Sequence, residues 1–450
     1  MIQKERIKIS SHQDSNGGSY VLYWMQASVR AHYNHALEYA IRNANKLKKP
    51  LIVYFGLTED FPEANQRHYH FLLEGLKETE FELEKKDIKM VVQHQKPGKG
   101  ALKLAEDASL LITDRGYLPL QRQWRGEVAE VIECPMIQVE SEVVIPVETA
   151  SPKEEYMAGT IRRKIQKQWD DFLVPLKMGK PHVSSLDLKF DSLNLQDIEK
   201  IMGQLKIDDS VRNVDWIQGG NLRARDHLNN FLENKLDHFS DFRNDPTQNY
   251  LSNMSPYLHF GHISPLYIAL QVQKTGGPGV ESYLEELIIR RELSMNFVYY
   301  DSDYDNFNCL PDWAQKTLLE HARDPREYEY SVEEFETAQT HDPYWNAAQK
   351  EMMHQGKMHG YMRMYWGKKI LEWTRNPMQA YHVALYLNNK YELDGRDPNG
   401  YTGVAWCFGK HDRAWKEREI FGKVRYMNDK GLRRKFRIDR YVESIENMVG

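Results

Sequence analysis

Acidic and basic side chains recur at helical spacing in the segment 285–293. Glu286 and Arg290 are four residues apart, so a helix would place both on one face. Such a pair stabilises an exposed helix by about 0.2–0.5 kcal/mol, and it could equally present two opposite charges to a ligand. The spacing alone leaves both interpretations open.

Glycines and carboxylates punctuate the stretch 391–406, which ends on Trp406. A calcium loop is one candidate, but the alternating ligands and the terminal glutamate of an EF-hand are absent. An ordinary surface turn is the stronger interpretation of these residues alone. The histidines have no convincing ligand spacing either, so we expect no metal site.

The segment 251–261 combines hydroxyl and amide side chains with a Ser-Pro helix start. Ser255 is a suitable N-cap and Pro256 a suitable first helical residue. The free N–H groups of a helix N-terminus can also hold a phosphate. From these residues alone, simple capping is the favoured interpretation.

Six of the ten tryptophans follow residue 300. Trp366 and Trp373 are seven residues apart in one predicted helix, so they share a face about 10.5 Å apart along its axis. That separation would permit electron hopping between indoles, yet it is equally ordinary for two core residues.

The elements that must position these groups fall into two kinds. Before residue 145, apolar runs of strand length alternate with polar segments of helical period, such as 30–47 and 68–86. This alternation predicts a doubly wound parallel α/β sheet. No phosphate-binding glycine motif follows the first strand, so nothing identifies what fills the crevice at the strand ends. The predicted strands are 20–25, 51–55, 88–92, 110–113 and 136–139.

The rest of the chain lacks strand patterning. Residues 146–215 have little regular apolar pattern and are predicted to connect two domains. From 216 to 450, apolar residues recur at helical spacing, which predicts an all-α domain. The expected organisation is therefore an α/β domain at 1–145, the connector and a helical domain.

Composition limits the class of protein. The chain has 450 residues, 41% hydrophobic and 28% charged, which is typical of a globular protein of two or three domains. Neither a signal-peptide core nor an apolar run of eighteen residues occurs. The three cysteines lie far apart, which favours a reducing compartment. We expect a soluble intracellular protein, cytoplasmic or located at the nucleoid or nucleus.

The net charge of −5 does not by itself indicate a nucleic-acid binder. Between His411 and Arg440, however, eleven Lys or Arg stand against five Asp or Glu. This basic segment could contact DNA phosphates or could be a solvated helical surface.

Five stretches in this order resemble the class II branch of the photolyase/cryptochrome family, the cyclobutane pyrimidine dimer (CPD) photolyases. The matches are dense between about residues 219 and 426, whereas the N-terminal half matches mainly in the order of its elements. The stretches are Gly219-Gly220 with Ala224 and Leu228, SNMSPYLHFG at 252–261, 341–349, 357–366, and 392–406.

The resemblance implies an FAD cofactor, bent inside the helical domain, whose working form is the reduced anion FADH⁻. The residues implied to line its phosphates are Ser252, Asn253, Met254 and Ser255. Those implied to surround the flavin ring are Asn346, Arg363 and Asp394, with Asn388 facing flavin N5 and Arg290 a weaker candidate for a cofactor contact. A guanidinium stabilises the anion, and Asp394 would orient it.

The implied substrate is UV-damaged DNA whose CPD leaves the helix to reach the flavin. Glu286 would hydrogen-bond the lesion, and Met364 and Trp406 would pack on its rings. Arg243 would contact the damaged strand, and Arg425 would fill the gap in the duplex. Some relatives carry Trp near position 290, so no aromatic lesion contact is assigned there. Neither a membrane nor an obligate protein partner is expected.

The implied reaction is a light-driven electron cycle. Excited FADH⁻ donates an electron to the dimer, two ring bonds break, and the electron returns. Photoreduction of the flavin would use Trp366 nearest the flavin, then Trp345, then Trp373 near the surface. A second antenna chromophore is implied for the N-terminal crevice, but no motif identifies it.

Three other functions are compared with this one. A cryptochrome-like light receptor would share the fold and FAD but would not need Glu286, Met364 and Trp406 as a lesion pocket. Repair of (6-4) photoproducts would require a histidine acid beside the flavin. A non-enzymatic nucleic-acid binder would hold no flavin.

Overall fold

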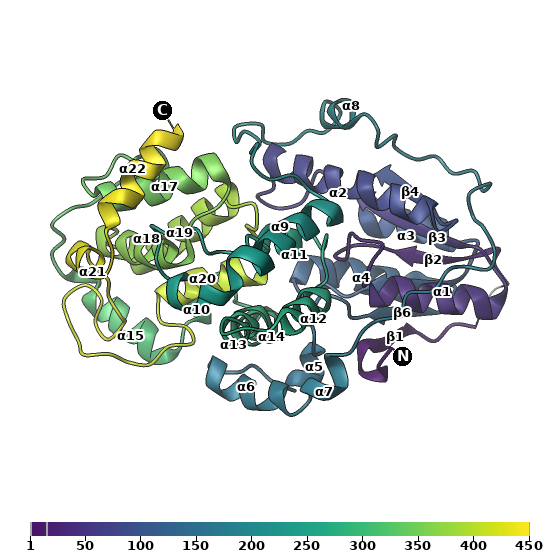
Figure 1. Cartoon of the computed structure of the whole chain (residues 1–450), viewed down its shortest axis with the longest axis horizontal. Helices are drawn as coiled ribbons and strands as arrows, with labels where there is room; N and C mark the ends of the chain where they lie inside the picture. The colour runs from purple at the N-terminus through teal and green to yellow at the C-terminus, as the bar shows by residue number, and fades with distance from the viewer. Residues whose placement is uncertain (1, 15–16, 450) are drawn as a thin grey trace.

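The computed structural model describes residues 2–14 and 17–449. An α/β half and a helical half lie side by side along the longest axis of the molecule (Figure 1). No helix within these residues is both long enough and apolar enough to cross a bilayer.

The α/β half is built on one six-stranded sheet in the order β1-β6-β5-β2-β3-β4. The five predicted strands are confirmed. All four pairs between them are parallel: β6 with β5, β5 with β2, β2 with β3, and β3 with β4. The strand that sequence reasoning missed, β1, pairs antiparallel with β6 at the edge. The strands are β1 (Ile7–Ser11), β2 (Tyr20–Trp24), β3 (Leu51–Leu57), β4 (Lys89–His94), β5 (Ala108–Asp114) and β6 (Met136–Val139).

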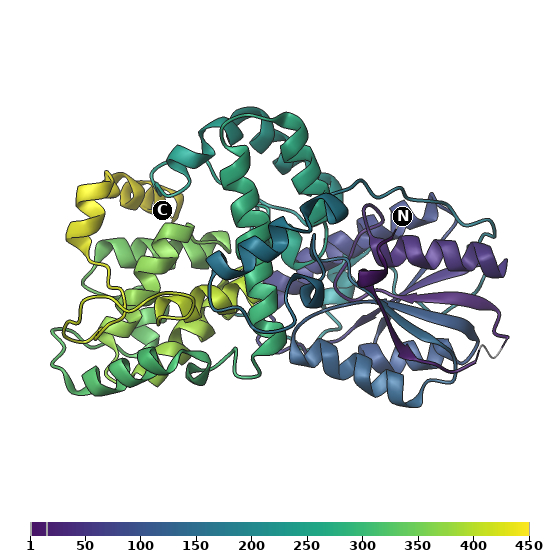
Figure 2. The same ribbon diagram turned by 90° about the horizontal axis from the view of Figure 1, so that it is seen from below.

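Helices cover both faces of this sheet, as Figure 2 shows. Val21 and Tyr23 of β2 pack into one core with α1 and α2, whereas Leu22 and Trp24 pack into a second core with α3 and α4. The alternation of side chains along one strand therefore supplies both cores. The helices are α1 (His35–Leu47), α2 (Gln66–Glu84), α3 (Pro97–Ala105) and α4 (Pro119–Val131), preceded by η1 (Lys4–Arg6).

The segment 146–215 packs against both halves. Ile161 and Phe172 join a core of the helical half, while Leu195 and Leu205 join the core between α1, α2 and the sheet. Long polar stretches separate these few apolar anchors, which is why the sequence showed little regular pattern. Its helices are α5 (Val147–Ala150), α6 (Ala158–Gln166), α7 (Trp169–Phe172) and α8 (Ile198–Met202).

The helical half contains the tryptophan-rich core. Its principal helices are α9 (Asn221–Asn234), α11 (Ser255–His259), α12 (Pro265–Thr275), α13 (Val280–Leu284), α14 (Arg291–Tyr300), α17 (Pro343–Gln355), α18 (Gly360–Trp373), α19 (Pro377–Tyr391), α20 (Pro398–Cys407), α21 (Asp429–Lys435) and α22 (Ile438–Val449). The remaining ones are η2 (Leu236–His238), α10 (Phe239–Phe242), η4 (Phe307–Cys309), α15 (Asp312–Glu320), η5 (His321–Arg323) and α16 (Val332–Glu336). A π-helical segment, η3 (Glu285–Arg290), joins α13 to α14 without a break.

Two arginines of the α/β half fix the loops that carry the candidate site. Arg30 donates to the carbonyl oxygen of Gly261 at 2.8 Å, directly after α11. Arg67 donates to the carbonyl oxygen of Tyr391 at 2.6 Å, where the loop 392–397 begins. Both guanidinium groups are buried, so these bonds hold the two halves in one arrangement.

The predicted helix start at Ser255 is wrong by one residue. Met254 is the N-cap of α11, no side chain caps the helix, and Ser255 is its first helical residue. Because the side chain of Ser255 is exposed and not used for capping, its hydroxyl stays available to a ligand.

Candidate functional site

A cavity of about 740 Å³ lies in the helical half. Its walls come from segments far apart in the chain, namely the loop before α11, the segment η3, the loop before α18, and α20 with the loop that precedes it. This volume falls within the range of about 300–1,000 Å³ that is typical of cofactor and ligand pockets.

Twelve of the seventeen predicted site residues line this one cavity. They are Arg243, Ser252, Asn253, Met254, Ser255, Glu286, Arg290, Arg363, Met364, Asp394, Trp406 and Arg425. The chain therefore gathers residues that span 183 positions of sequence, from 243 to 425, around one space. The roles assigned to them remain predictions.

Arg363 is the main cation of the inner wall. Its Nη2 lies 2.9 Å from Glu392 Oε1 and 3.7 Å from Asp394 Oδ1. Burial alone would lower the pKa of Arg363, but these two carboxylates outweigh it and raise the pKa above its ordinary value. Burial raises the pKa of Glu392, and the charge of Arg363 opposes this shift by favouring the ionised carboxylate. Sequence reasoning missed Glu392, although it stands two residues before Asp394 in the same loop.

Hydroxyl, amide and ammonium groups meet at another part of the wall. Asn253 adopts a left-handed backbone conformation, with φ of +58°, and its side-chain oxygen accepts a hydrogen bond from Lys357 Nζ. Tyr283 donates to Ser252 Oγ at 3.1 Å. Lys357 was not predicted, and it adds a positive charge beside the polar residues, which suits an anionic group.

Two predicted flavin contacts do not line the cavity. Asn346 makes three hydrogen bonds to Thr340, including Nδ2 to the carbonyl oxygen at 2.7 Å, so its amide is already occupied. Asn388 is buried behind α20. Its Nδ2 donates to Asn389 at 3.3 Å, while its Oδ1 has no partner among the described residues. This unsatisfied acceptor is a group that a ligand could satisfy.

Of the two interpretations left open for Glu286 and Arg290, the i,i+4 ion pair does not form. Arg290 Nε lies 3.2 Å from Glu285, and Glu286 is 2.6 Å from Arg243 instead. The cause is the π-helical geometry of η3, whose hydrogen bonds span five residues, so position 285 rather than 286 lies beside 290. Glu286 and Arg290 still both line the cavity.

The three predicted electron-transfer tryptophans form one contact chain. The rings of Trp366 and Trp345 are stacked, with centroids 6.4 Å apart and planes 7° apart. Trp345 then meets Trp373 at 6.0 Å. Trp373 is itself only 3% exposed, but its ring contacts the exposed His341, so its predicted place near the surface stays a prediction.

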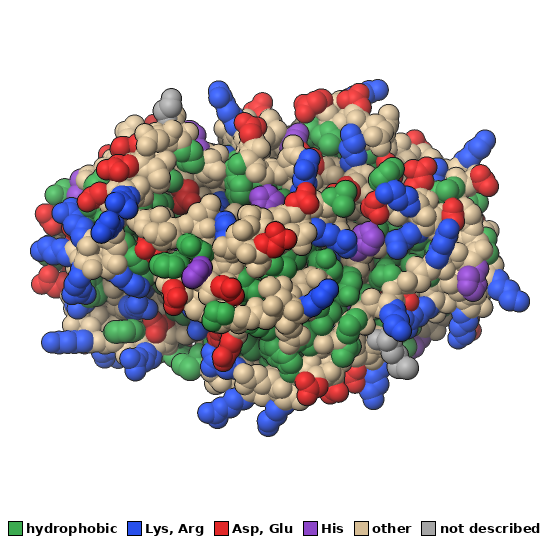
Figure 3. All heavy atoms as spheres, viewed as in Figure 1, with side chains coloured by type: hydrophobic (Ala, Val, Ile, Leu, Met, Phe, Trp, Pro, Cys, Tyr) green, Lys and Arg blue, Asp and Glu red, His purple; other side chains and the backbone are tan. Residues whose placement is uncertain are grey.

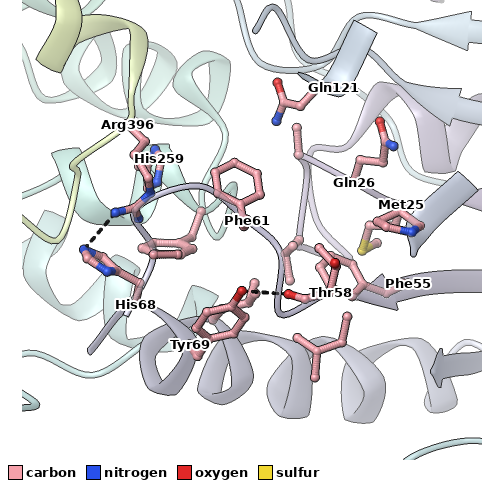
Figure 4. A pocket seen from close by; sticks show the side chains of 18 of the residues that line it. Met25, Gln26, Phe55, Thr58, Phe61, His68, Tyr69, Gln121, His259 and Arg396 are labelled. Atoms are coloured by element: carbon pink, nitrogen blue, oxygen red, sulfur yellow. Dashed lines mark hydrogen bonds between the residues drawn. The ribbon is translucent and has the colours of Figure 1, made fainter. Parts of the chain in front are cut away.

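A second cavity, of about 120 Å³, lies at the carboxyl ends of β2 and β3 (Figure 4). Met25 directly follows β2 and Phe55 belongs to β3, whereas His259 and Arg396 come from the helical half. Arg396 Nη1 lies 3.1 Å from His68 Nε2. Burial holds the pKa of His68 well below its ordinary value, so this imidazole is neutral at neutral pH.

Lysine and arginine side chains gather at the end of the molecule over α21 (Figure 3). The last turn of α21 contains Arg433, Arg434 and Lys435. Lys435 and Arg425 also reach the lining of the larger cavity. The basic segment therefore leads to the mouth of the candidate site.

Known proteins are similar to this chain in sequence and in structure. A family model described as DNA photolyase matches residues 21–182. The deoxyribodipyrimidine photo-lyase of Methanothermobacter thermautotrophicus is 57% identical over 450 residues, covering 100% of both chains. A class III photolyase from Agrobacterium tumefaciens has a TM-score of 0.75 at 16% identity, covering 97% of this chain and 88% of its own. An archaeal photolyase from Sulfolobus tokodaii, solved with two FAD molecules, has a TM-score of 0.71 at 16% identity, covering 94% and 89%.

The structural neighbours confirm the predicted fold, an α/β half followed by a helical half. The relative from Methanothermobacter, more than half identical along the whole chain, goes further. On this evidence the chain belongs to the DNA photolyase family.

Proposed function

We propose that this protein is a class II-type CPD photolyase, which uses light and FADH⁻ to split cyclobutane pyrimidine dimers in DNA. The observation that carries the proposal is the shared cavity. It holds the guanidinium of Arg363, which suits an anionic flavin. The same cavity holds Glu286, Met364 and Trp406, the groups suited to the lesion. Class II membership rests on the five sequence stretches at 219–220, 252–261, 341–349, 357–366 and 392–406.

The residues present fit FAD. The hydroxyl and amide groups of Ser252, Asn253 and Ser255, with the ammonium of Lys357, suit the diphosphate. Arg363 lines the cavity, and its Nε has no hydrogen-bond partner in the described part of the chain, so it has capacity left for the ring. Asn388 does not line the cavity, but its Oδ1, which lacks a partner among the described residues, would suit a donor such as N5–H if the ring reaches it.

The bound, reduced cofactor would supply an electron when illuminated and take it back after the ring bonds have broken. The residues of the chain position the cofactor and the lesion and keep water away from them. Arg363 keeps a fixed positive charge in the wall, because Glu392 and Asp394 raise its pKa. Asn346 is left out of the proposed contacts, since Thr340 occupies its amide.

The lesion would occupy the part of the cavity beside Glu286. The Glu286 carboxylate, 39% exposed and paired with Arg243, can exchange that partner for the lesion while Arg243 turns to the damaged strand. The faces of Met364 and Trp406 would pack on the rings. Arg425, exposed at the cavity mouth, would enter the gap left in the duplex.

Trp366, Trp345 and Trp373 would bring electrons to the flavin when it needs reduction. Trp366 follows Arg363 by one turn of α18, so the chain begins beside the proposed ring site. Ring separations of 6.4 and 6.0 Å favour stepwise transfer over a single long jump. The smaller cavity is the proposed place of a second chromophore of unassigned identity.

The test uses photoreduced protein and an oligonucleotide with one thymine dimer. Recovery of absorbance at 260 nm is followed in the dark and under blue light, for the wild type, Glu286→Gln and Glu281→Gln. Glu281 is exposed on α13 outside the cavity, so its variant is the matched control. We expect light-dependent recovery that only Glu286→Gln weakens. No recovery, with reduced flavin bound and DNA binding intact, contradicts the proposal.

A further inference from the structure

A lysine of α18, Lys369, stands over the outermost ring of the tryptophan chain. Its Nζ lies 5.4 Å from the centroid of the Trp373 ring and 5.6 Å from that of the Tyr365 ring. The lysine side chain is only 8% exposed, so water screens its charge weakly. Among the described residues, no lysine or arginine stands over the ring of Trp345 or Trp366. The ammonium therefore acts on the outer ring more strongly than on the two inner rings.

Glu372, three residues further along α18, compensates this charge only in part. Its Oε2 lies 2.7 Å from Lys369 Nζ. The glutamate side chain is 27% exposed, against 8% for the lysine, so solvent weakens the field of the carboxylate more than that of the ammonium. The net field at Trp373 is therefore that of a partly compensated cation.

A carboxylate lies beside the middle tryptophan. Asp342 is the N-cap of α17, and its Oδ1 accepts a hydrogen bond from the backbone N–H of Trp345 at 3.1 Å. The other oxygen of Asp342 accepts from the hydroxyl of Tyr365. Since Asp342 is buried, water screens this charge weakly as well. Tyr365 thus lies between the carboxylate of Asp342 and the ammonium of Lys369.

These two charges oppose the outer electron-transfer step. An oxidised tryptophan is a cation, so a neighbouring carboxylate lowers its energy and a neighbouring ammonium raises it. When Trp373 gives an electron to oxidised Trp345, the positive charge moves from the residue beside the carboxylate to the residue under the ammonium. The ring separation of 6.0 Å favours this transfer, whereas the charges disfavour it.

We propose that Lys369 controls the outer electron-transfer step electrostatically and so sets how readily Trp373 supplies electrons for photoreduction of the flavin. This inference rests on the proposed function, because it takes the three tryptophans as the electron path. In each event one electron leaves Trp366 for the illuminated oxidised flavin, Trp345 refills Trp366, and Trp373 refills Trp345. Trp373 ends one electron short, and a thiol in solution restores it. Lys369 exchanges no electron or proton and acts through its charge alone.

The consequence is a lower yield of photoreduction. While the positive charge stays on Trp366 or Trp345, the electron on the flavin can return to it. Only transfer from Trp373 moves the charge to the end of the chain, and Lys369 disfavours that transfer. Dimer splitting by flavin that is already reduced does not use this path, so the charge of Lys369 leaves it unchanged.

The experiment applies single blue flashes to the flavin-loaded, oxidised protein in the presence of a thiol. Transient absorbance gives the lifetime of the oxidised tryptophan, and the fraction of flavin that stays reduced gives the yield. The variants are Lys369→Met, Lys369→Arg and Glu372→Gln. The matched control is Lys316→Met, which removes the cation of an exposed i,i+4 pair with Glu320 on α15. Flavin content and dimer splitting by chemically reduced protein are measured separately.

We expect Lys369→Met to favour electron transfer from Trp373 by roughly tenfold, which lengthens the lifetime and raises the yield. Glu372→Gln should change both quantities in the opposite direction, because it leaves the ammonium uncompensated. Lys369→Arg, which keeps the charge, and Lys316→Met should match the wild type. An ion pair with a merely structural role predicts the same change in Lys369→Met and Glu372→Gln, since each breaks it. Changes of the same sign, or no change, would overturn the inference.

The remaining outcomes are assigned as follows. If Lys369→Met binds no flavin, Glu372→Gln decides, and a yield at or above that of the wild type would overturn the inference. A wild-type protein that light does not reduce would overturn it too, while dimer splitting by the chemically reduced form would still support the proposed function. The expected changes in the variants without any dimer splitting would support control by Lys369 and contradict the proposed function.

Discussion

Glu292 lies at the joint between the two halves, and replacing it with glutamine tests how that joint is held. Its side chain is buried in α14 and accepts hydrogen bonds from the backbone N–H groups of Val144 at 2.6 Å and Ile145 at 3.2 Å. Burial raises the pKa of Glu292 from 4.5 to about 8. The neighbouring Arg290 and Arg291 line the larger cavity, so the joint also positions the site.

The sign of the pH dependence follows from this pKa. In the folded chain Glu292 keeps its proton up to about pH 8, whereas in the unfolded chain it ionises near 4.5. The contribution to stability is therefore fully present below about pH 4.5 and is lost as the pH rises through 8. At about 1.4 kcal/mol per pH unit, the upper limit of the loss is about 5 kcal/mol.

Glu292→Gln keeps an acceptor oxygen for the two N–H groups and cannot ionise. Urea unfolding of both proteins between about pH 5 and about pH 9 measures the difference in their free energies of unfolding. We expect the variant to gain on the wild type by about 1.4 kcal/mol per pH unit up to about pH 8, and by nothing further above it. The exposed Glu281→Gln should show no such slope. A flat or falling difference for Glu292→Gln would refute the reasoning.

Three further predictions concern the larger cavity and its surroundings. Arg363→Met leaves Glu392 and Asp394 buried without their cation, so we expect a loss of about 3–5 kcal/mol in the free energy of unfolding, by urea titration, and a lower flavin content, by absorbance. Trp345→Phe should slow photoreduction of oxidised flavin while repair by chemically reduced protein stays at the wild-type yield, which flash photolysis checks. Arg425→Met should lose roughly tenfold in affinity for a dimer in duplex DNA but little for a dimer in a single strand, because only a duplex has a gap to fill; equal losses in both would contradict its assigned place.

The α/β half could be predicted because its strands are apolar on both faces. Buried parallel strands read as nearly continuous apolar runs, and all five were found. β1 was missed because a short edge strand, IKISS, needs only one partner and buries few of its residues.

The candidate site was harder to predict, because its geometry depends on tertiary packing. Helical spacing could not foresee the π-helical segment, which pairs Arg290 with Glu285. Trp345 comes from α17 and meets Trp366 only through packing of two helices, so the spacing of Trp366 and Trp373 alone could not reveal the stack. Lys357 was passed over because one lysine in a polar loop has no periodic signal.

The most direct test of the central claim is the number of dimers split for each flavin oxidised. Reduced protein, free of oxygen, receives an excess of single-dimer oligonucleotide and a train of blue flashes. The unjoined thymines are then counted by chromatography and the flavin by absorbance. Because the electron returns after each cycle, we predict many dimers split per protein with the flavin still reduced. One dimer per flavin oxidised, or splitting without light, would contradict the account.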